Sequence, residues 1–85
     1  MKFVFTELSF EDYLFWQKND KHKLIIINEL LKDISRSSYE GIGRPEPLRF
    51  NYAGFWSRRI DDEHRLIYRV IVDEIQIVKC RFHYD

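Results

Sequence analysis

The sequence predicts an α+β fold in which a helical hairpin packs on one face of a mostly antiparallel sheet. Three observations lead to this prediction. Helical periodicity is confined to the first half of the chain, strand-like runs of β-branched and aromatic residues fill the second half, and short turn-forming segments separate those runs. With 85 residues, of which 45% are hydrophobic and 16% aromatic, residues 1–85 are expected to form one domain with a rich core.

The first half is predicted to fold as one short strand followed by two helices. Residues 2–5, Lys-Phe-Val-Phe, form a short, mainly apolar stretch that fits an initial strand. Ser9 is the expected N-cap of the first helix, because a hydroxyl before an acidic first turn and an apolar stripe over residues 10–17 is typical of a helix start. Asn19-Asp20 interrupts the pattern, and a second helix is predicted from about Lys21 to Ser35. A connection this short favours an antiparallel hairpin.

The second half is predicted to fold as a loop and three strands. Residues 35–47 are rich in Ser, Gly and Pro and are expected to form a loop. The strands are expected at residues 54–60, 65–72 and 75–82, joined by the turns 61–64 and 73–74. The predicted order is therefore β-α-α-β-β-β.

Alternation along these strands separates an apolar face from a basic face. The expected basic face contains Ser57, Arg59, Arg65, Ile67, Arg69, Lys79, Arg81 and His83. The expected apolar face contains Trp56, Ile60, Leu66, Tyr68, Val70, Val78, Cys80 and Phe82. We expect the helices to cover the apolar face and to leave the basic face open, with Cys80 in the core.

Composition excludes several classes of protein. The 14 Lys and Arg balance the 14 Asp and Glu, although Arg is concentrated in the second half. No apolar run approaches the ~20 residues that span a bilayer, and no signal peptide is evident, so a cytoplasmic protein without a membrane partner is expected. The single Cys80 excludes an internal disulfide and a multi-cysteine metal site, and residues 41–45 lack the pattern of a nucleotide-binding loop.

Three side-chain types in the second half suggest acid–base chemistry. Glu46 lies between two prolines and is a pre-placed base, or simply a solvent-facing residue of a rigid turn. His83 is a potential general acid or an inert surface imidazole, and Arg65 binds a phosphate or forms a structural ion pair. Together they suffice for RNA cleavage without a metal or cofactor. The acidic segment 61–64 is either a divalent-ion site or, more simply, a solvated turn.

Four motifs resemble the YoeB (Txe/YoeB) toxins of the RelE-like superfamily. They are Glu-Gly-Ile-Gly-Arg-Pro-Glu-Pro-Leu at 40–48, Gly-Phe-Trp-Ser-Arg-Arg-Ile at 54–60, Glu-His-Arg-Leu-Ile-Tyr at 63–68 and Cys-Arg-Phe-His-Tyr at 80–84. The resemblance implies a microbial ribonuclease-like fold and a type II toxin that cleaves mRNA in the A site of the 70S ribosome, stopping translation. It further implies a YefM-like antitoxin as partner and contact with operator DNA only through the antitoxin complex, and it leaves a homodimer open.

The resemblance also implies roles for individual residues. Glu46 would be the general base, His83 the general acid, Arg65 the group that stabilises the transition-state phosphate, and Tyr84 a positioning residue. The residues expected to bind RNA or the ribosome are Arg49, Arg59, Lys79 and Arg81. The family often has Lys where this chain has Arg49, and this chain continues one residue past Tyr84, to Asp85. The alternatives are a non-catalytic inhibitor that binds the ribosome or nucleic acid through the basic face, and a co-repressor that acts only with the antitoxin.

Overall fold

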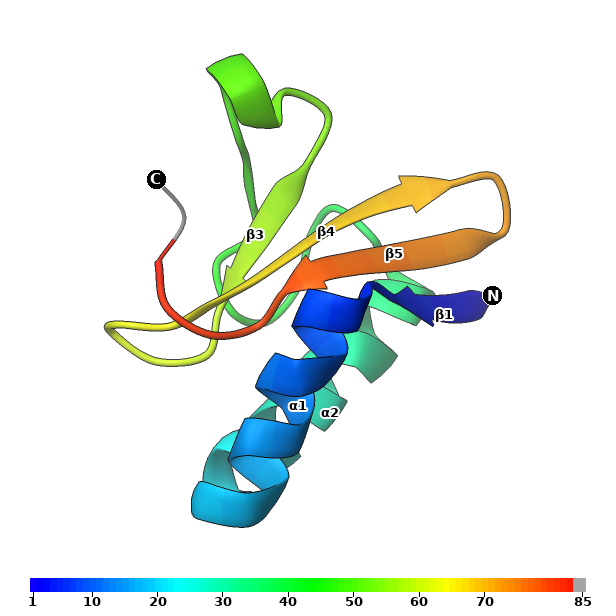
Figure 1. Cartoon of the computed structure of the whole chain (residues 1–85). Helices are drawn as coiled ribbons and strands as arrows, with labels where there is room; N and C mark the ends of the chain where they lie inside the picture. Colours follow the sequence, from blue (N-terminus) through cyan, green and yellow to red (C-terminus); the bar gives the residue numbers. More distant parts are fainter. Residues whose placement is uncertain (84–85) are drawn as a thin grey trace.

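Two helices pack on one face of a five-stranded, mostly antiparallel sheet in the computed structural model, which describes residues 1–83 (Figure 1). The elements are β1 (Lys2–Phe5), α1 (Glu7–Asn19), α2 (Lys21–Arg36), β2 (Glu46–Pro47), the 3₁₀ turn η1 (Phe50–Tyr52), β3 (Trp56–Arg59), β4 (Arg65–Ile71) and β5 (Glu74–Lys79). The strand order is β1-β5-β4-β3-β2, and only β1 and β5 are parallel. The predicted α+β class is confirmed, with one additional short strand.

The helical hairpin begins three residues earlier than predicted. Thr6, not Ser9, is the N-cap of α1, because the Thr6 hydroxyl accepts a hydrogen bond from the Ser9 N–H at 3.0 Å. Ser9 is instead buried inside the first turn, where its hydroxyl donates to the Ile77 carbonyl of β5 at 2.7 Å. Asp20 ends α1 and caps α2, so the two helices follow each other without a loop.

The core lies between the helices and the central strands. Its fully buried members include Ile27, Leu30 and Ile34 of α2 and the strand residues Leu66, Tyr68, Ile75 and Ile77. The Trp16 indole N–H donates to the Cys80 carbonyl at 2.8 Å, which ties α1 to the segment after β5. Cys80 is completely buried, as predicted, and burial raises the pKa of its thiol to about 12.

Two predicted boundaries are wrong in ways that affect the site. Glu46 and Pro47 were expected in a loop but form β2, which pairs with Ser57 and Trp56 at the sheet edge. A proline is tolerated there because the outer side of an edge strand has no partner strand, so not every backbone N–H has to donate a hydrogen bond. β5 was expected to reach Phe82 but ends at Lys79, after a β-bulge opposite Ile67 and Tyr68.

The early end of β5 changes the predicted faces. Arg81 and His83 do not continue the alternation of Lys79, because the chain turns after Lys79 and Phe82 has a φ of 64°. The prediction that these three side chains share one strand face is therefore wrong. The basic face is also not fully open: Arg65 is only 7% exposed and Ile67 is completely buried.

Candidate active site

The sheet register brings three of the predicted site residues to the face opposite the helices. Glu46 pairs with Ser57, which pairs in turn with Ile67, and Arg59 pairs with Arg65. Directly paired residues project from the same face of a sheet, so Glu46, Arg59 and Arg65 share a face. Their neighbours Arg58 and Leu66 project to the other face and are completely buried.

The loop that leads from α2 to Glu46 is fixed by the buried Arg58. Its guanidinium forms an ion pair with Asp33 and donates to the carbonyls of Ser37, Glu40 and Ile42. The Arg58 hydrogen bond lowers the pKa of Asp33. Gly41, with φ of 125°, leaves room for this pair, because a Cβ there would lie 2.0 Å from an Asp33 oxygen.

The turn that precedes β4 fixes the Arg65 side chain by two hydrogen bonds. Arg65 Nη1 donates to the Asp61 carbonyl at 2.7 Å and to the His64 carbonyl at 3.1 Å. The Asp61 carboxylate organises this turn by accepting the backbone N–H groups of Glu63 and His64 and pairing with Lys23 of α2 at 2.9 Å. Burial alone would raise the pKa of Asp61, but these partners outweigh it and lower the pKa to about 2.

The C-terminal segment is fastened beside Arg65 by two hydrogen bonds to Phe82. The Arg65 N–H donates to the Phe82 carbonyl at 3.0 Å, and the Phe82 N–H donates to His64 Nδ1 at 2.7 Å. The next residue is His83, which is exposed, and its carbonyl accepts a hydrogen bond from Lys79 Nζ at 2.7 Å. These bonds bring the backbone of the predicted general acid next to that of the predicted phosphate-binding arginine.

His64 was not predicted as part of this site. The sequence showed only an acidic turn, 61–64, with metal binding as the functional alternative. Among residues 1–83 no three His, Cys, Asp or Glu side chains gather as a metal site would require. His64 is instead buried edge-to-face against Trp16, and its Nδ1 is an acceptor. Alternation along β4 does place His64 on the same side as Leu66, toward the helices. Its hydrogen-bond partner, the Phe82 N–H, was not foreseen because Phe82 was predicted to lie in a strand that in fact ends at Lys79.

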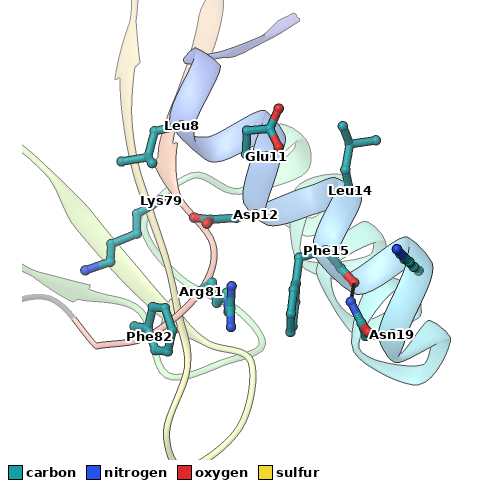
Figure 2. Close-up of a pocket in the computed structure, with 10 residues that line it drawn as sticks. Leu8, Glu11, Asp12, Leu14, Phe15, Asn19, Lys79, Arg81 and Phe82 are labelled. Carbon is teal, nitrogen blue, oxygen red and sulfur yellow. Dashed lines mark hydrogen bonds between the residues drawn. The ribbon is translucent and has the colours of Figure 1, made fainter.

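Arg81 lies apart from the face that carries Glu46 and Arg65. Its guanidinium is sandwiched between the rings of Phe15, at 3.5 Å, and Phe82, at 4.4 Å. This stack lines a depression of about 630 Å³ between α1 and the C-terminal segment (Figure 2). Asp12 lies in the same depression, where burial raises the pKa of its carboxyl although it accepts the Cys80 N–H.

Arg49 extends the site along the β2–β3 hairpin. It is exposed and lines an open depression of about 750 Å³ together with Glu46, Pro47, Leu48 and Phe50. Tyr84 and Asp85 lie outside the residues that the structure describes. The arrangement as a whole offers a carboxylate, a braced guanidinium and an imidazole from three separate segments, which is a set suited to proton transfer around a phosphate.

Comparisons with known proteins give a consistent result. Residues 5–84 match the model of the YoeB-like toxin of bacterial type II toxin–antitoxin systems. Toxin YoeB from Escherichia coli (strain K12) is 54% identical over 84 residues, which cover 99% of this chain and 100% of the relative.

Solved structures also match this chain over nearly its whole length. The YoeB/ParE toxin from Agrobacterium tumefaciens is 45% identical, with a TM-score of 0.97 over 99% of this chain and 100% of that one. The toxin in a heterotetrameric YoeB–YefM complex from Staphylococcus aureus is 48% identical, with a TM-score of 0.92, covering 99% of this chain and 98% of that chain. A YoeB dimer from the same organism has a TM-score of 0.93 at 48% identity, with the same coverage.

Proposed function

The chain belongs to the YoeB-like toxins of bacterial type II toxin–antitoxin systems, and from this premise we propose that it is an endoribonuclease that cleaves mRNA in the ribosomal A site. Cleavage there would stop translation. The observation that supports the proposal is that the three segments carrying Glu46, Arg65 and His83 adjoin one another in the fold. Glu46 lies in β2, which pairs with β3, and Arg65 begins β4, which pairs with β3 on its other side. The Arg65 N–H in turn holds the carbonyl of Phe82, the residue before His83.

The proposed reaction is an attack by the 2′-oxygen of one ribose on the adjacent phosphate. Glu46 removes the proton from the 2′-hydroxyl, and the P–O bond forms as the bond to the 5′-oxygen of the next nucleotide breaks. Arg65 stabilises the negative charge on the five-coordinate phosphate, and His83 donates a proton to the departing 5′-oxygen. The products are a 2′,3′-cyclic phosphate and a 5′-hydroxyl. Tyr84 is proposed to position the scissile phosphate or a base.

The bracing of Arg65 supports this assignment over a role in a structural ion pair. Its Nη1 hydrogen bonds go to backbone carbonyls, not to a carboxylate. Its positive charge is therefore not neutralised by these partners, and the side chain is fixed before substrate binds. A guanidinium held in this way loses little conformational entropy when it binds a phosphate.

The proposed partners follow from the same premise. We propose that Arg49, Arg59, Lys79 and Arg81 contact RNA or the ribosome, with Lys79 also holding the His83 carbonyl. A YefM-like antitoxin would inhibit the toxin, operator DNA would be contacted only through that complex, and a homodimer is a further proposed state. The site of action would be the cytoplasm, where ribosomes are. Neither helix described in residues 1–83 has the length and apolar character needed to cross a membrane.

Induced expression of a Glu46→Ala, His83→Ala double variant in bacteria tests the proposal. We expect growth arrest by the wild-type chain and normal growth with the variant. The matched control is Glu29→Ala, His22→Ala, which removes the same two side-chain types from exposed positions of α2 and should remain toxic. Full toxicity of the site variant would favour a non-catalytic inhibitor and contradict the proposal.

A further inference from the structure

Phe50 is exposed in a way that the fold does not explain. Its side chain is 91% accessible to solvent, whereas the next most exposed aromatic residue of the described chain, Tyr39, is 53% accessible. Its φ is 56°, in the left-handed region that bulky aromatic residues rarely adopt. Such conformations persist only when the surrounding structure enforces them, and they are enriched at ligand-binding sites.

The backbone on both sides of Phe50 is firmly held. The Phe50 carbonyl accepts the Ala53 N–H at 3.0 Å, and the Arg49 carbonyl accepts the Tyr52 N–H at 3.0 Å. The hairpin is closed by the hydrogen bond from the Leu48 N–H to the Phe55 carbonyl at 2.9 Å, and the Leu48 side chain is buried. The ring is therefore presented to solvent by an ordered turn, η1, at the tip of a hairpin that projects away from both helices (Figure 1).

The ring lies beside the proposed reaction site. Phe50 lines the same depression as Glu46 and Arg49, the proposed general base and a proposed phosphate contact. Each nucleotide of an RNA strand has a base that stacks on aromatic rings and a phosphate that pairs with cations. An aromatic ring beside a guanidinium, as in Phe50 and Arg49, is therefore suited to bind one nucleotide. An apolar surface of another protein would fit this depression poorly, because the depression also holds the exposed carboxylate of Glu46 and the exposed guanidinium of Arg49.

We propose that the Phe50 ring is a stacking platform for an unpaired base of the RNA substrate, next to the cleaved phosphate. This inference rests on the proposed function, since it assigns part of the substrate to the same site. Stacking of a base on an aromatic side chain is tolerant of sequence, so the ring would position RNA without selecting one base. Alanine substitution at such positions typically weakens RNA binding by about 5- to 150-fold.

Binding can be measured separately from cleavage. Ribosomes are programmed with an mRNA that carries 2-aminopurine at successive A-site positions and a 2′-deoxy sugar at the cleaved nucleotide, which removes the attacking oxygen. Stacking quenches the fluorescence of 2-aminopurine. We expect the wild-type chain to quench one position, Phe50→Tyr to do the same, and Phe50→Ala and Phe50→Asn to lose the quenching and bind about 5- to 150-fold more weakly.

Two controls separate stacking from folding. Val72→Ala removes an apolar side chain that is 95% exposed and also has a positive φ, 52°, but lies in the β4–β5 turn, and it should behave as wild type. Asn tolerates positive φ better than Phe, so Phe50→Asn should unfold at a temperature no lower than that of the wild-type chain. If Phe50→Ala folds poorly, Phe50→Asn provides the same test.

The outcomes distinguish this inference from the proposed function. Wild-type cleavage of the all-ribose mRNA together with unchanged binding and quenching by Phe50→Asn would overturn the stacking role and leave the nuclease intact. Quenching that depends on Phe50, without any cleavage by the wild-type chain, would support stacking and contradict the nuclease. Loss of antitoxin binding alone, with RNA quenching unchanged, would assign the ring to a protein interface and overturn the inference.

Discussion

Replacing Asp61 by Asn should destabilise the protein at neutral pH and leave it nearly unchanged in acid. The carboxylate joins α2 to the turn before β4 through Lys23 and accepts two backbone N–H groups of that turn. Its pKa is lowered from 3.8 to about 2, because these partners outweigh the effect of burial. Since a shift of one pKa unit corresponds to about 1.4 kcal/mol, ionised Asp61 contributes at most about 2–3 kcal/mol to the free energy of unfolding.

The sign of the pH dependence follows from the lowered pKa. The contribution of Asp61 is complete above about pH 4, where the carboxyl is ionised in the unfolded chain as well. It is lost as the pH falls through the folded-state pKa of about 2, because both states are then protonated. The difference in stability between wild type and Asp61→Asn should therefore be largest at pH 7 and shrink between pH 4 and pH 2.

Urea unfolding of both proteins across this range measures the effect. Asp73→Asn is the matched control, because its side chain is 77% exposed and its ion contact with the N-terminus is long, at 3.8 Å. It should change stability little at any pH. Equal stability of wild type and Asp61→Asn at pH 7 would show that the Asp61 carboxylate does not stabilise the fold. A difference that does not shrink in acid would show that the charge of Asp61 is not its source.

Three further outcomes are expected. Arg58→Met should cost about 3–5 kcal/mol in urea unfolding because it removes the close ion pair of the partly buried Asp33 carboxylate and leaves that group only the Ile42 N–H and a 3.6 Å contact with Arg36, whereas the exposed Arg36→Met should cost little; similar losses would contradict the role of Arg58. Cys80 should react with a thiol reagent at pH 8 only at the rate of unfolding, since its pKa is about 12, and rapid reaction of the native protein would be inconsistent with its burial. His64→Ala should accelerate hydrogen exchange of the Phe82 N–H and slow RNA cleavage at saturating ribosome. His64→Asn keeps an acceptor near the position of Nδ1, so it should retain part of the exchange protection and part of the cleavage rate. Unchanged exchange in His64→Ala would disprove the hydrogen bond between His64 and Phe82.

Local patterns were sufficient to predict the fold class. The helical hairpin follows from the two apolar stripes and from the interruption at Asn19-Asp20, where Asp20 both ends α1 and caps α2. The central strands follow from their runs of β-branched and aromatic residues bounded by short turns. The N-cap was predicted wrongly because Thr and Ser are both residue types that cap helices well. In the fold, the Ser9 hydroxyl donates a hydrogen bond to the Ile77 carbonyl of β5, and Thr6 is the cap. A contact between residues 68 positions apart cannot be read from local sequence.

The site was predictable only in part for the same reason. Alternation placed Arg59 and Arg65 on one face, and the register agrees with it. It did not predict the bulge that ends β5, so it wrongly extended that face to Arg81 and His83. The residues that brace the site, Arg58 and His64, were missed because an arginine and a histidine become structural only through distant partners, here Asp33 and Phe82.

The chemical ends of the RNA products distinguish attack by the 2′-oxygen from hydrolysis by water. Ribosomes assembled on a defined mRNA are mixed with excess toxin in the presence of EDTA, and the fragments of one turnover are analysed. We expect a 5′-hydroxyl on one fragment and a 2′,3′-cyclic phosphate on the other, with cleavage slowed by about 10²–10⁴-fold in Glu46→Gln and in His83→Gln. Fragments with 5′-phosphate ends, or wild-type rates in both variants, would contradict the proposed acid–base mechanism.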